Sequence, residues 1–286
     1  MTQPASRKEV LAELRAQGFH ANARLGQCFL FDHQLLEAFL DDADVRAGEL
    51  VLEVGAGAGT LTERLLARGC RVVAAEIDQR LIAYLRAHIH DPNFELLEGD
   101  VLAGKNALSP QLLERLDGAE FRLVANLPYA VATPVLASLV ESFPGFRGAA
   151  ALVQTELARR WLASSGDGDY GVISVLLAML GQGQMTRSVR RELFTPPPRV
   201  DSTFVVWQRN QRPFAEIAAA MGVLRTLFQQ RRKMIRSLVG DVLPVGDPWW
   251  SSAPFQGTDR PGDVPAAALV ALGLEVEERR QQGDPR

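Results

Sequence analysis

The sequence is poor in cysteine, in lysine and in long apolar runs. Its 286 residues include two cysteines, Cys28 and Cys70, too few for a disulfide framework. Its four histidines form no HExxH motif and no Cys/His spacing typical of a metal site. The longest near-apolar run, residues 172–180, is far shorter than the roughly 20 residues that a membrane-spanning helix needs. The N-terminus carries no secretory signal pattern. These absences predict a cytoplasmic protein that binds no metal.

The composition excludes a disordered protein, and the charged residues are unevenly distributed along the chain. Hydrophobic residues make up 47 % of the chain, too many for a disordered protein. The formal net charge is −3, but residues 185–236 contain eleven Lys and Arg against three Asp and Glu, a local charge of +8. The rest of the chain therefore carries −3 − 8 = −11. A basic segment on an acidic body is a candidate phosphate-binding surface, and a solvated arginine-rich surface has the same pattern.

From residue 49 onward, short apolar runs alternate with helical patterns. The sequence predicts helices at 60–69 and 79–90 and strands at 49–54, 71–77, 94–100, 122–127 and 149–154. This alternation is typical of an α/β fold with a mostly parallel, Rossmann-like sheet and helices on both faces. The run 172–180 is apolar on all sides and fits a buried helix or a buried strand.

The pattern changes after residue 209. Three prolines after Thr195 predict a rigid, extended loop, and a last strand follows at 202–208. Helical patterns at 216–240 and 265–273 predict a small C-terminal helical domain, with a loose tail at 275–286. We therefore expect an N-terminal arm at 1–25 with one short helix, an α/β domain at 26–209 and a helical domain at 210–286.

A glycine loop follows the first strand of the predicted sheet. Gly55, Gly57 and Gly59 stand where the strand turns into a helix. Glycine permits close backbone approach, and a helix N-terminus offers free N–H groups to a ligand. The dinucleotide pattern GxGxxG would need glycine at Thr60, and the lysine of a phosphate-binding P-loop is absent. The spacing suits a ligand that places carboxyl and ammonium groups at the loop.

Acidic residues end the next two strands. Glu76 can hold two ribose hydroxyls, as an acid does at this place in doubly wound nucleotide sites. Ile77 can cover one face of an adenine, and Asp100 can accept from its amino group. A nucleoside with an amino-acid tail is S-adenosylmethionine, so we predict that cofactor. Taken singly, each acid also fits a surface position at a strand end.

The sequence Asn126-Leu127-Pro128-Tyr129 follows the fourth strand. The exocyclic amine of adenine is a poor nucleophile, because its lone pair is delocalised into the ring. The oxygen of Asn126 and a backbone carbonyl near Leu127 or Pro128 can accept its two N–H groups and direct the lone pair at a methyl donor. Tyr129 offers an aromatic face for a base taken out of its stack. A Pro-Tyr turn with an asparagine cap is the structural alternative.

These motifs resemble the ribosomal RNA adenine N6,N6-dimethyltransferase family. The resemblance spans roughly residues 20–240 and rests on segments in the family's order, namely LGQCFL, LEVGAGAGTLTERL, EID, EGD, NLPY, YGVISV, FTPPPRVDST and FQQRRKMIRSL. It implies transfer of two methyl groups to each of two adjacent adenines in a hairpin loop of small-subunit (16S) rRNA. It also implies the assembling 30S subunit as the partner, and a helical C-terminal domain that we expect to bind RNA. We expect a monomer, although the sequence itself carries no oligomer signal.

The resemblance also assigns residues. The cofactor positions that it implies are Cys28, Leu30, Gly55, Glu76, Asp100 and Asn126, to which the loop and strand-end patterns add Gly57 and Ile77. Phe194 would stack on the flipped adenine, or else be a core aromatic beside the proline loop. Arg231, Arg232 and Lys233 would contact phosphates, or else form a solvated helix face. The chain departs from the family at Cys28, where Asn or His is usual, and at residues 130–132, which are less polar than usual.

Three alternatives remain open at this point. The first is a large-subunit adenine methyltransferase of the antibiotic-resistance type, which more often has Ile at the position of Leu127. The second is a non-catalytic RNA-binding assembly factor that has kept the fold, or a transcription-factor relative. The third, a DNA adenine methyltransferase, is disfavoured because those enzymes usually have an acidic residue at the position of Asn126.

Overall fold

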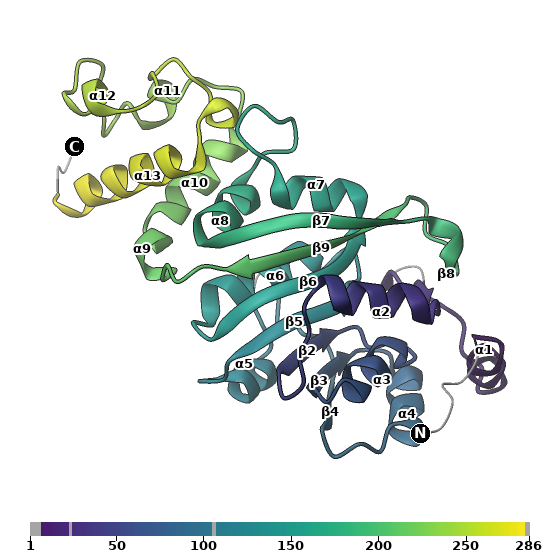
Figure 1. The fold of residues 1–286 in the computed structure, drawn as a ribbon. Helices are drawn as coiled ribbons and strands as arrows, with labels where there is room; N and C mark the ends of the chain where they lie inside the picture. Colours follow the sequence, from purple (N-terminus) through teal and green to yellow (C-terminus); the bar gives the residue numbers. More distant parts are fainter. Residues whose placement is uncertain (1–6, 23–24, 105–106, 284–286) are drawn as a thin grey trace. The chain divides into compact units, whose positions relative to one another are not determined.

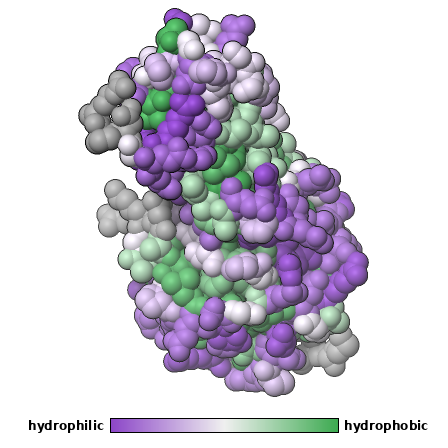
Figure 2. All heavy atoms as spheres, turned by 90° about the vertical axis from the view of Figure 1, so that its left-hand side faces the viewer, coloured by the Kyte–Doolittle hydropathy of each residue, from purple (hydrophilic) through white to green (hydrophobic). Residues whose placement is uncertain are grey.

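The computed structural model describes residues 7–22, 25–104 and 107–283 (Figure 1). Contacts divide the chain into two compact units. The first unit consists of residues 1–158 and 184–208, and the second of residues 159–183 and 209–286. On the face drawn in Figure 2, hydrophilic side chains cover much of the surface and apolar ones show in smaller areas between them.

A seven-stranded sheet has the order β4-β3-β2-β5-β6-β9-β7 (Figure 1). Its strands are β2 (Leu50–Val54), β3 (Arg71–Glu76), β4 (Phe94–Glu98), β5 (Phe121–Asn126), β6 (Phe146–Gln154), β7 (Gly181–Val189) and β9 (Ser202–Arg209). The neighbouring pairs from β4 to β6 are parallel, and β9 is antiparallel to β6. The predicted α/β class and its five parallel strands are therefore confirmed. From β2 the chain runs outward through β3 to β4, and then crosses to the other side of β2 to form β5. The carboxyl ends of β2 and β5 therefore flank a topological switch point, where such sheets bind ligands.

Helices connect these strands. They are α2 (His33–Asp42), α3 (Thr60–Ala67), α4 (Gln79–His88), α5 (Pro110–Leu116), α6 (Ala132–Ser142) and α7 (Thr155–Leu162). Their starts follow local capping chemistry, because the side chains of Asp32, Asp78 and Ser109 accept from backbone N–H groups of the first turns of α2, α4 and α5. Apolar side chains of α2 and α3 pack on the sheet in one core, where the Phe39 and Phe204 rings stack 4.1 Å apart.

A second, two-stranded sheet lies outside the main one. Strand β1 (Phe29–Leu30) pairs with β8 (Phe194–Thr195), with Leu30 opposite Phe194. The predicted N-terminal helix is α1 (Arg7–Ala16), whose Val10 and Leu14 are buried in a cluster with Leu81 and Tyr84 of α4.

The second unit is built on three helices in mutual contact. These are α8 (Val172–Leu180), α10 (Ala220–Gln229) and α13 (Ala266–Gln281), joined by short helices α9 (Ala215–Ala218), α11 (Arg236–Val239) and α12 (Trp249–Ser252). Helices α10 and α13 pack closely, since a Cβ atom on Gly273 would lie 2.7 Å from the Cβ atom of Ala220. Within the described residues, no helix is long and apolar enough to cross a membrane.

Several details differ from the sequence-based expectations. Residues 159–183 belong to the second unit rather than the α/β domain, because α8 packs against α10 and α13. Residues 216–240 form separate helices instead of one, with residues 230–235 between α10 and α11. The tail was predicted to be loose, but α13 continues to Gln281, with Val276 fully buried. Strand β7 was missed, because most of its residues are polar and exposed.

Candidate functional site

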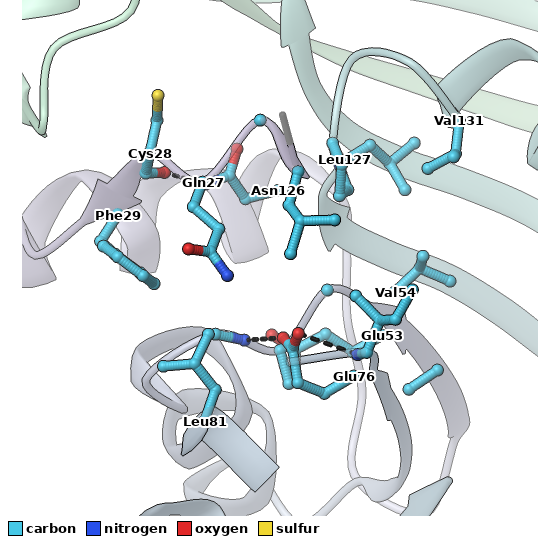
Figure 3. A pocket seen from close by; sticks show the side chains of 18 of the residues that line it. Gln27, Cys28, Phe29, Glu53, Val54, Glu76, Leu81, Asn126, Leu127 and Val131 are labelled. Atoms are coloured by element: carbon cyan, nitrogen blue, oxygen red, sulfur yellow. Dashed lines mark hydrogen bonds between the residues drawn. The ribbon is translucent and has the colours of Figure 1, made fainter. Parts of the chain in front are cut away.

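A pocket lies at the carboxyl ends of β2, β3, β4 and β5, the place where open parallel sheets bind ligands (Figure 3). Apart from Phe194, all the cofactor-binding and catalytic residues predicted from the sequence line it: Cys28, Leu30, Gly55, Gly57, Glu76, Ile77, Asp100, Asn126, Leu127, Pro128 and Tyr129. The sheet thus brings together residues that lie far apart in the chain, from 28 to 129.

The glycine loop packs tightly against the elements around it. Gly55 has φ +76°, and a Cβ atom there would lie 3.1 Å from Cγ of Pro128. Gly57 has φ +60°, and a Cβ atom there would lie 3.0 Å from the Phe29 ring. Both positions need a residue that tolerates left-handed backbone and has no side chain. The loop is therefore held close against Phe29 and Pro128 along one side of the pocket.

Glu76, at the end of β3, shapes that loop. Its carboxylate accepts from the backbone N–H of Gly57 at 2.8 Å, of Ile77 at 2.9 Å and of Asp78 at 3.0 Å. The side chain is 5 % exposed, and burial raises its pKa against the opposing effect of these three bonds. A carboxylate has about four acceptor sites, so capacity for a ligand hydroxyl is left.

Ile77 and Asp100 lie on the more open side of the pocket. Ile77 is 43 % exposed and lines the pocket, so its side chain can contact the face of a flat ring. One oxygen of Asp100 accepts from the backbone N–H of Leu102 at 2.9 Å, which fixes the carboxylate at the end of β4. Its second oxygen can accept from a ligand amino group.

Glu53 also lines the pocket and was not singled out from the sequence. It lies at the end of β2, is 2 % exposed and accepts a hydrogen bond from Oγ1 of Thr62 at 2.6 Å. Burial raises its pKa to about 8, so the carboxyl is largely protonated at neutral pH. Its place before the glycines, in the pattern ExGxGxG, was the available signal.

Asn126 is held from the opposite side of the pocket (Figure 3). Its Nδ2 donates to the backbone carbonyl of Cys28 at 3.0 Å. A carbonyl can only accept, so the nitrogen must face Cys28 and Oδ1 points the other way. The amide is therefore oriented as a hydrogen-bond acceptor for a ligand.

Cys28 contacts Asn126 through its backbone carbonyl. In Figure 3 its side chain points away from Glu53 and Glu76, and burial raises the pKa of the thiol. A neutral thiol is a weak nucleophile and a weak hydrogen-bond donor. The difference from the Asn or His usual in the family therefore leaves the contact with Asn126 intact.

The loop after β5 is anchored on both sides. Pro128 packs on Gly55, and the hydroxyl of Tyr129 lies 3.2 Å from Oγ of the buried Ser202. The Tyr129 ring is partly buried, and burial raises its pKa, so the hydroxyl stays protonated. Ser202 is a supporting residue that the sequence patterns did not identify as part of the site.

The structure does not bring Phe194 into the pocket. Its ring is 1 % exposed and belongs to the same core cluster as Leu30 and Phe204. In this structure Phe194 is the core aromatic that was the alternative interpretation. Stacking on a flipped adenine requires the ring to leave this core.

The three predicted phosphate-binding residues lie in the second unit. Arg231, Arg232 and Lys233 are exposed and lie in a turn after α10, not on a helix face. Nη1 of Arg231 donates to the carbonyl of Gly168 at 2.9 Å, which fixes one side of the turn. Over the part of the chain that the structure describes, no group of three or more His, Cys, Asp or Glu side chains could hold a metal ion.

The pocket combines a doubly wound sheet, a glycine loop after β2 and an asparagine whose amide nitrogen is already bound to a backbone carbonyl. This combination is typical of a methyltransferase. The profile of the family described as "Ribosomal RNA adenine dimethylase" matches residues 18–253. A relative from Leifsonia xyli subsp. xyli, named "Ribosomal RNA small subunit methyltransferase A", is 39 % identical over 95 % of this chain and 91 % of its own length. The chain belongs to the ribosomal RNA adenine dimethylase family.

Solved structures agree on the fold. A dimethyladenosine transferase from Plasmodium falciparum is 23 % identical and has a TM-score of 0.71, covering 88 % of this chain and 98 % of that one. The 23S rRNA methyltransferase ErmE is 25 % identical and has a TM-score of 0.56, covering 89 % of this chain and 100 % of that one. Both similarities extend through most of the two units.

Proposed function

We propose that this protein transfers methyl groups from S-adenosylmethionine to N6 of two adjacent adenines in a hairpin loop of small-subunit rRNA, giving N6,N6-dimethyladenosine. The observation that carries the proposal is the amide of Asn126. Its Nδ2 is bound to the carbonyl of Cys28 and its side chain lines the pocket at the end of β5, which leaves Oδ1 as the amide atom that can accept from a ligand. Such an oxygen can accept a hydrogen bond from the exocyclic amine of an adenine.

The pocket residues fit the cofactor. Gly55 and Gly57 line the pocket without side chains, so their backbone would be accessible to a ligand's amino-acid tail. Glu76 offers one remaining acceptor site for a ribose hydroxyl, and Ile77 and Asp100 suit the face and the amino group of an adenine. S-adenosylmethionine, when bound, supplies a methyl group on a cationic sulfur.

The chain's own residues would position the acceptor. Oδ1 of Asn126 and a backbone carbonyl of Leu127 or Pro128 would accept the two N–H groups of the adenine amine. That arrangement draws the nitrogen out of conjugation and aligns its lone pair, so much of the rate comes from orientation. Tyr129, held by Ser202, would contact the flipped base. The methylated ammonium is acidic and loses its proton to water without a strong base.

The substrate assignment rests on relatives. The Leifsonia protein at 39 % identity is named for the ribosomal small subunit, and it aligns with nearly the whole chain. We extend that to this chain, acting as a monomer on the assembling 30S subunit in the cytoplasm. The exposed cluster of Arg231, Arg232 and Lys233 would contribute phosphate contacts.

A large-subunit substrate is the second candidate, because the fold also matches ErmE, which is named a 23S rRNA methyltransferase. The lower TM-score, 0.56 against 0.71, and Leu127 favour the small subunit. A non-catalytic assembly factor is disfavoured, because Glu76, Asn126 and the glycine loop are all in place.

The test is methyl transfer with nucleoside analysis. Purified protein and labelled S-adenosylmethionine are incubated with 30S and 50S subunits from cells that lack the modification. The proposal predicts labelled N6,N6-dimethyladenosine from the 30S particles alone. Label only in the 50S particles would support the second candidate, and RNA binding without any label would support the assembly factor.

A further inference from the structure

In Figure 3 the Gln27 side chain extends from the side of the pocket that carries Cys28 toward the side that carries Glu76. Its Oε1 accepts from the backbone N–H of Asn22 at 2.7 Å, and its Nε2 donates to Oδ2 of Asp78 at 3.0 Å. The first bond fixes the Gln27 side chain to the backbone of Asn22. The second attaches the same side chain to the turn between β3 and α4, on the cofactor side.

Asp78 is itself fixed in that turn. Its other oxygen, Oδ1, accepts from the backbone N–H of Arg80 at 3.0 Å and caps α4. Its backbone N–H donates to Glu76. Gln27 is therefore tied to the same turn that holds the predicted ribose-binding acid.

The residue after Gln27 supplies the carbonyl that orients Asn126. The same segment also lies on the loop after β5, since a Cβ atom on Gly26 would lie 3.7 Å from the backbone N of Tyr129. A shift at Gln27 is thus passed directly to the Cys28 carbonyl and to Asn126.

We infer that Gln27 is a positioning residue for methyl transfer, which fixes the acceptor oxygen of Asn126 relative to the cofactor side of the pocket through the Cys28 backbone. Gln27 itself touches neither reacting atom in this account. The inference rests on the proposed function, because it assigns Gln27 a role in the same site.

The hydrogen-bond polarity offers a sharp test. In Gln27→Glu, one carboxylate oxygen still accepts from Asn22, but the other faces the Asp78 carboxylate and repels it. In Asp78→Asn, the side chain can still cap α4, but two N–H donors then face each other at the Gln27 contact. In the double variant, the new amide at position 78 can donate to the new carboxylate at position 27, and the bond is restored with reversed polarity.

The experiment measures kcat and the KM for S-adenosylmethionine on unmethylated 30S subunits for wild type, both single variants and the double variant. Each single substitution should lower kcat about ten-fold, the scale expected of small misplacements near an active site, with KM changed less than about three-fold. The double variant should regain most of that loss, a coupling that independent structural effects would not give. Gln79→Glu, which adds a charge at an exposed neighbouring residue, should leave kcat unchanged.

Single variants with wild-type kcat, or a double variant no better than the singles, would overturn the inference. A crystal structure of Gln27→Ala provides a readout that does not depend on activity. It should show the contact between Asn126 and the Cys28 carbonyl lengthened or lost, and an unchanged contact would contradict the role of Gln27. A wild-type protein that transfers no methyl group would instead overturn the proposed function.

Discussion

Gly55 and Pro128 pack so closely that a Cβ atom on Gly55 would lie 3.1 Å from Cγ of Pro128. Gly55 belongs to the loop after β2, and Pro128 belongs to the loop after β5, so this contact joins the two halves of the pocket. It sets the separation between the place predicted for the methyl donor and the place predicted for its acceptor.

Substitution of Gly55 by alanine should therefore damage the site. The new side chain would press on Pro128 and would hold its backbone at φ +76°, where non-glycine residues are strained. We expect the affinity for S-adenosylhomocysteine to fall about ten-fold or more, since strain of about 1–3 kcal/mol is typical of such positions. Isothermal titration calorimetry measures this directly.

Gly222→Ala is the matched control. Gly222 lies within α10 in the second unit, and nothing lies within 4 Å of a Cβ atom placed there. Alanine should leave the affinity unchanged and stabilise the helix by about 0.5–1 kcal/mol. Equal affinities for the two variants would contradict the packing argument at Gly55.

The Cys28 side chain should be dispensable. The contact with Asn126 uses the Cys28 carbonyl, and the thiol points away from the acids of the pocket. Cys28→Ala and Cys28→Ser should both keep turnover within about three-fold of wild type. This change is smaller than the one expected from the loss of a hydrogen bond, which contributes about 1 kcal/mol. A loss of turnover in both variants, measured by methyl incorporation, would show that the sulfur is needed.

Glu53 should make the stability of the cofactor-free protein depend on pH. Its pKa is about 8 in the folded protein against 4.5 ordinarily, so above pH 4.5 the unfolded chain releases a proton that the folded chain retains. The free energy of unfolding should therefore fall as pH rises from 4.5 to about 8, and then level off. Glu76, whose pKa is also raised, acts in the same direction.

Glu53→Gln removes this titration, so its melting temperature should fall less than that of wild type over the same range. Thermal unfolding followed by circular dichroism at several pH values measures the difference. Glu114→Gln, at an exposed position on α5, serves as the control and should follow wild type. Parallel curves for wild type and Glu53→Gln would contradict the buried, protonated carboxyl.

The basic turn should contribute electrostatic affinity for rRNA. Arg232→Ala/Lys233→Ala keeps Arg231, whose contact with Gly168 holds the turn. Binding to 16S rRNA fragments should weaken, and the slope of log K against log salt should flatten by about one to two, because each lost phosphate contact removes about 0.7–0.9. Arg46→Ala/Arg71→Ala removes two exposed arginines of the first unit and should leave the slope unchanged.

The sequence alone predicted most of the residues that line the pocket, because the side chains with functional groups lie at the ends of strands. Short apolar runs located β2 to β6, and the residues just after them, such as Glu76, Asp100 and Asn126, had to meet at one edge of a parallel sheet. This rule needs only the strand order and no side-chain detail.

The rest depended on tertiary contacts. Gln27 and Ser202 act through hydrogen bonds to residues 51 and 73 positions away, which no local pattern encodes. Phe194 could be a stacking or a core aromatic, and only packing with the core of the first unit decides its place here. Helix α13 extends into the charged tail because Val276 is buried and Arg279 pairs with Asp247.

Single-turnover methyl transfer by Asn126→Ala on unmethylated 30S subunits measures whether the Asn126 amide accepts the adenine amine. We expect a rate lower by about 100-fold, the scale for loss of one preorganised hydrogen-bond partner, with binding to rRNA largely intact. A rate close to that of wild type would contradict this role of Asn126.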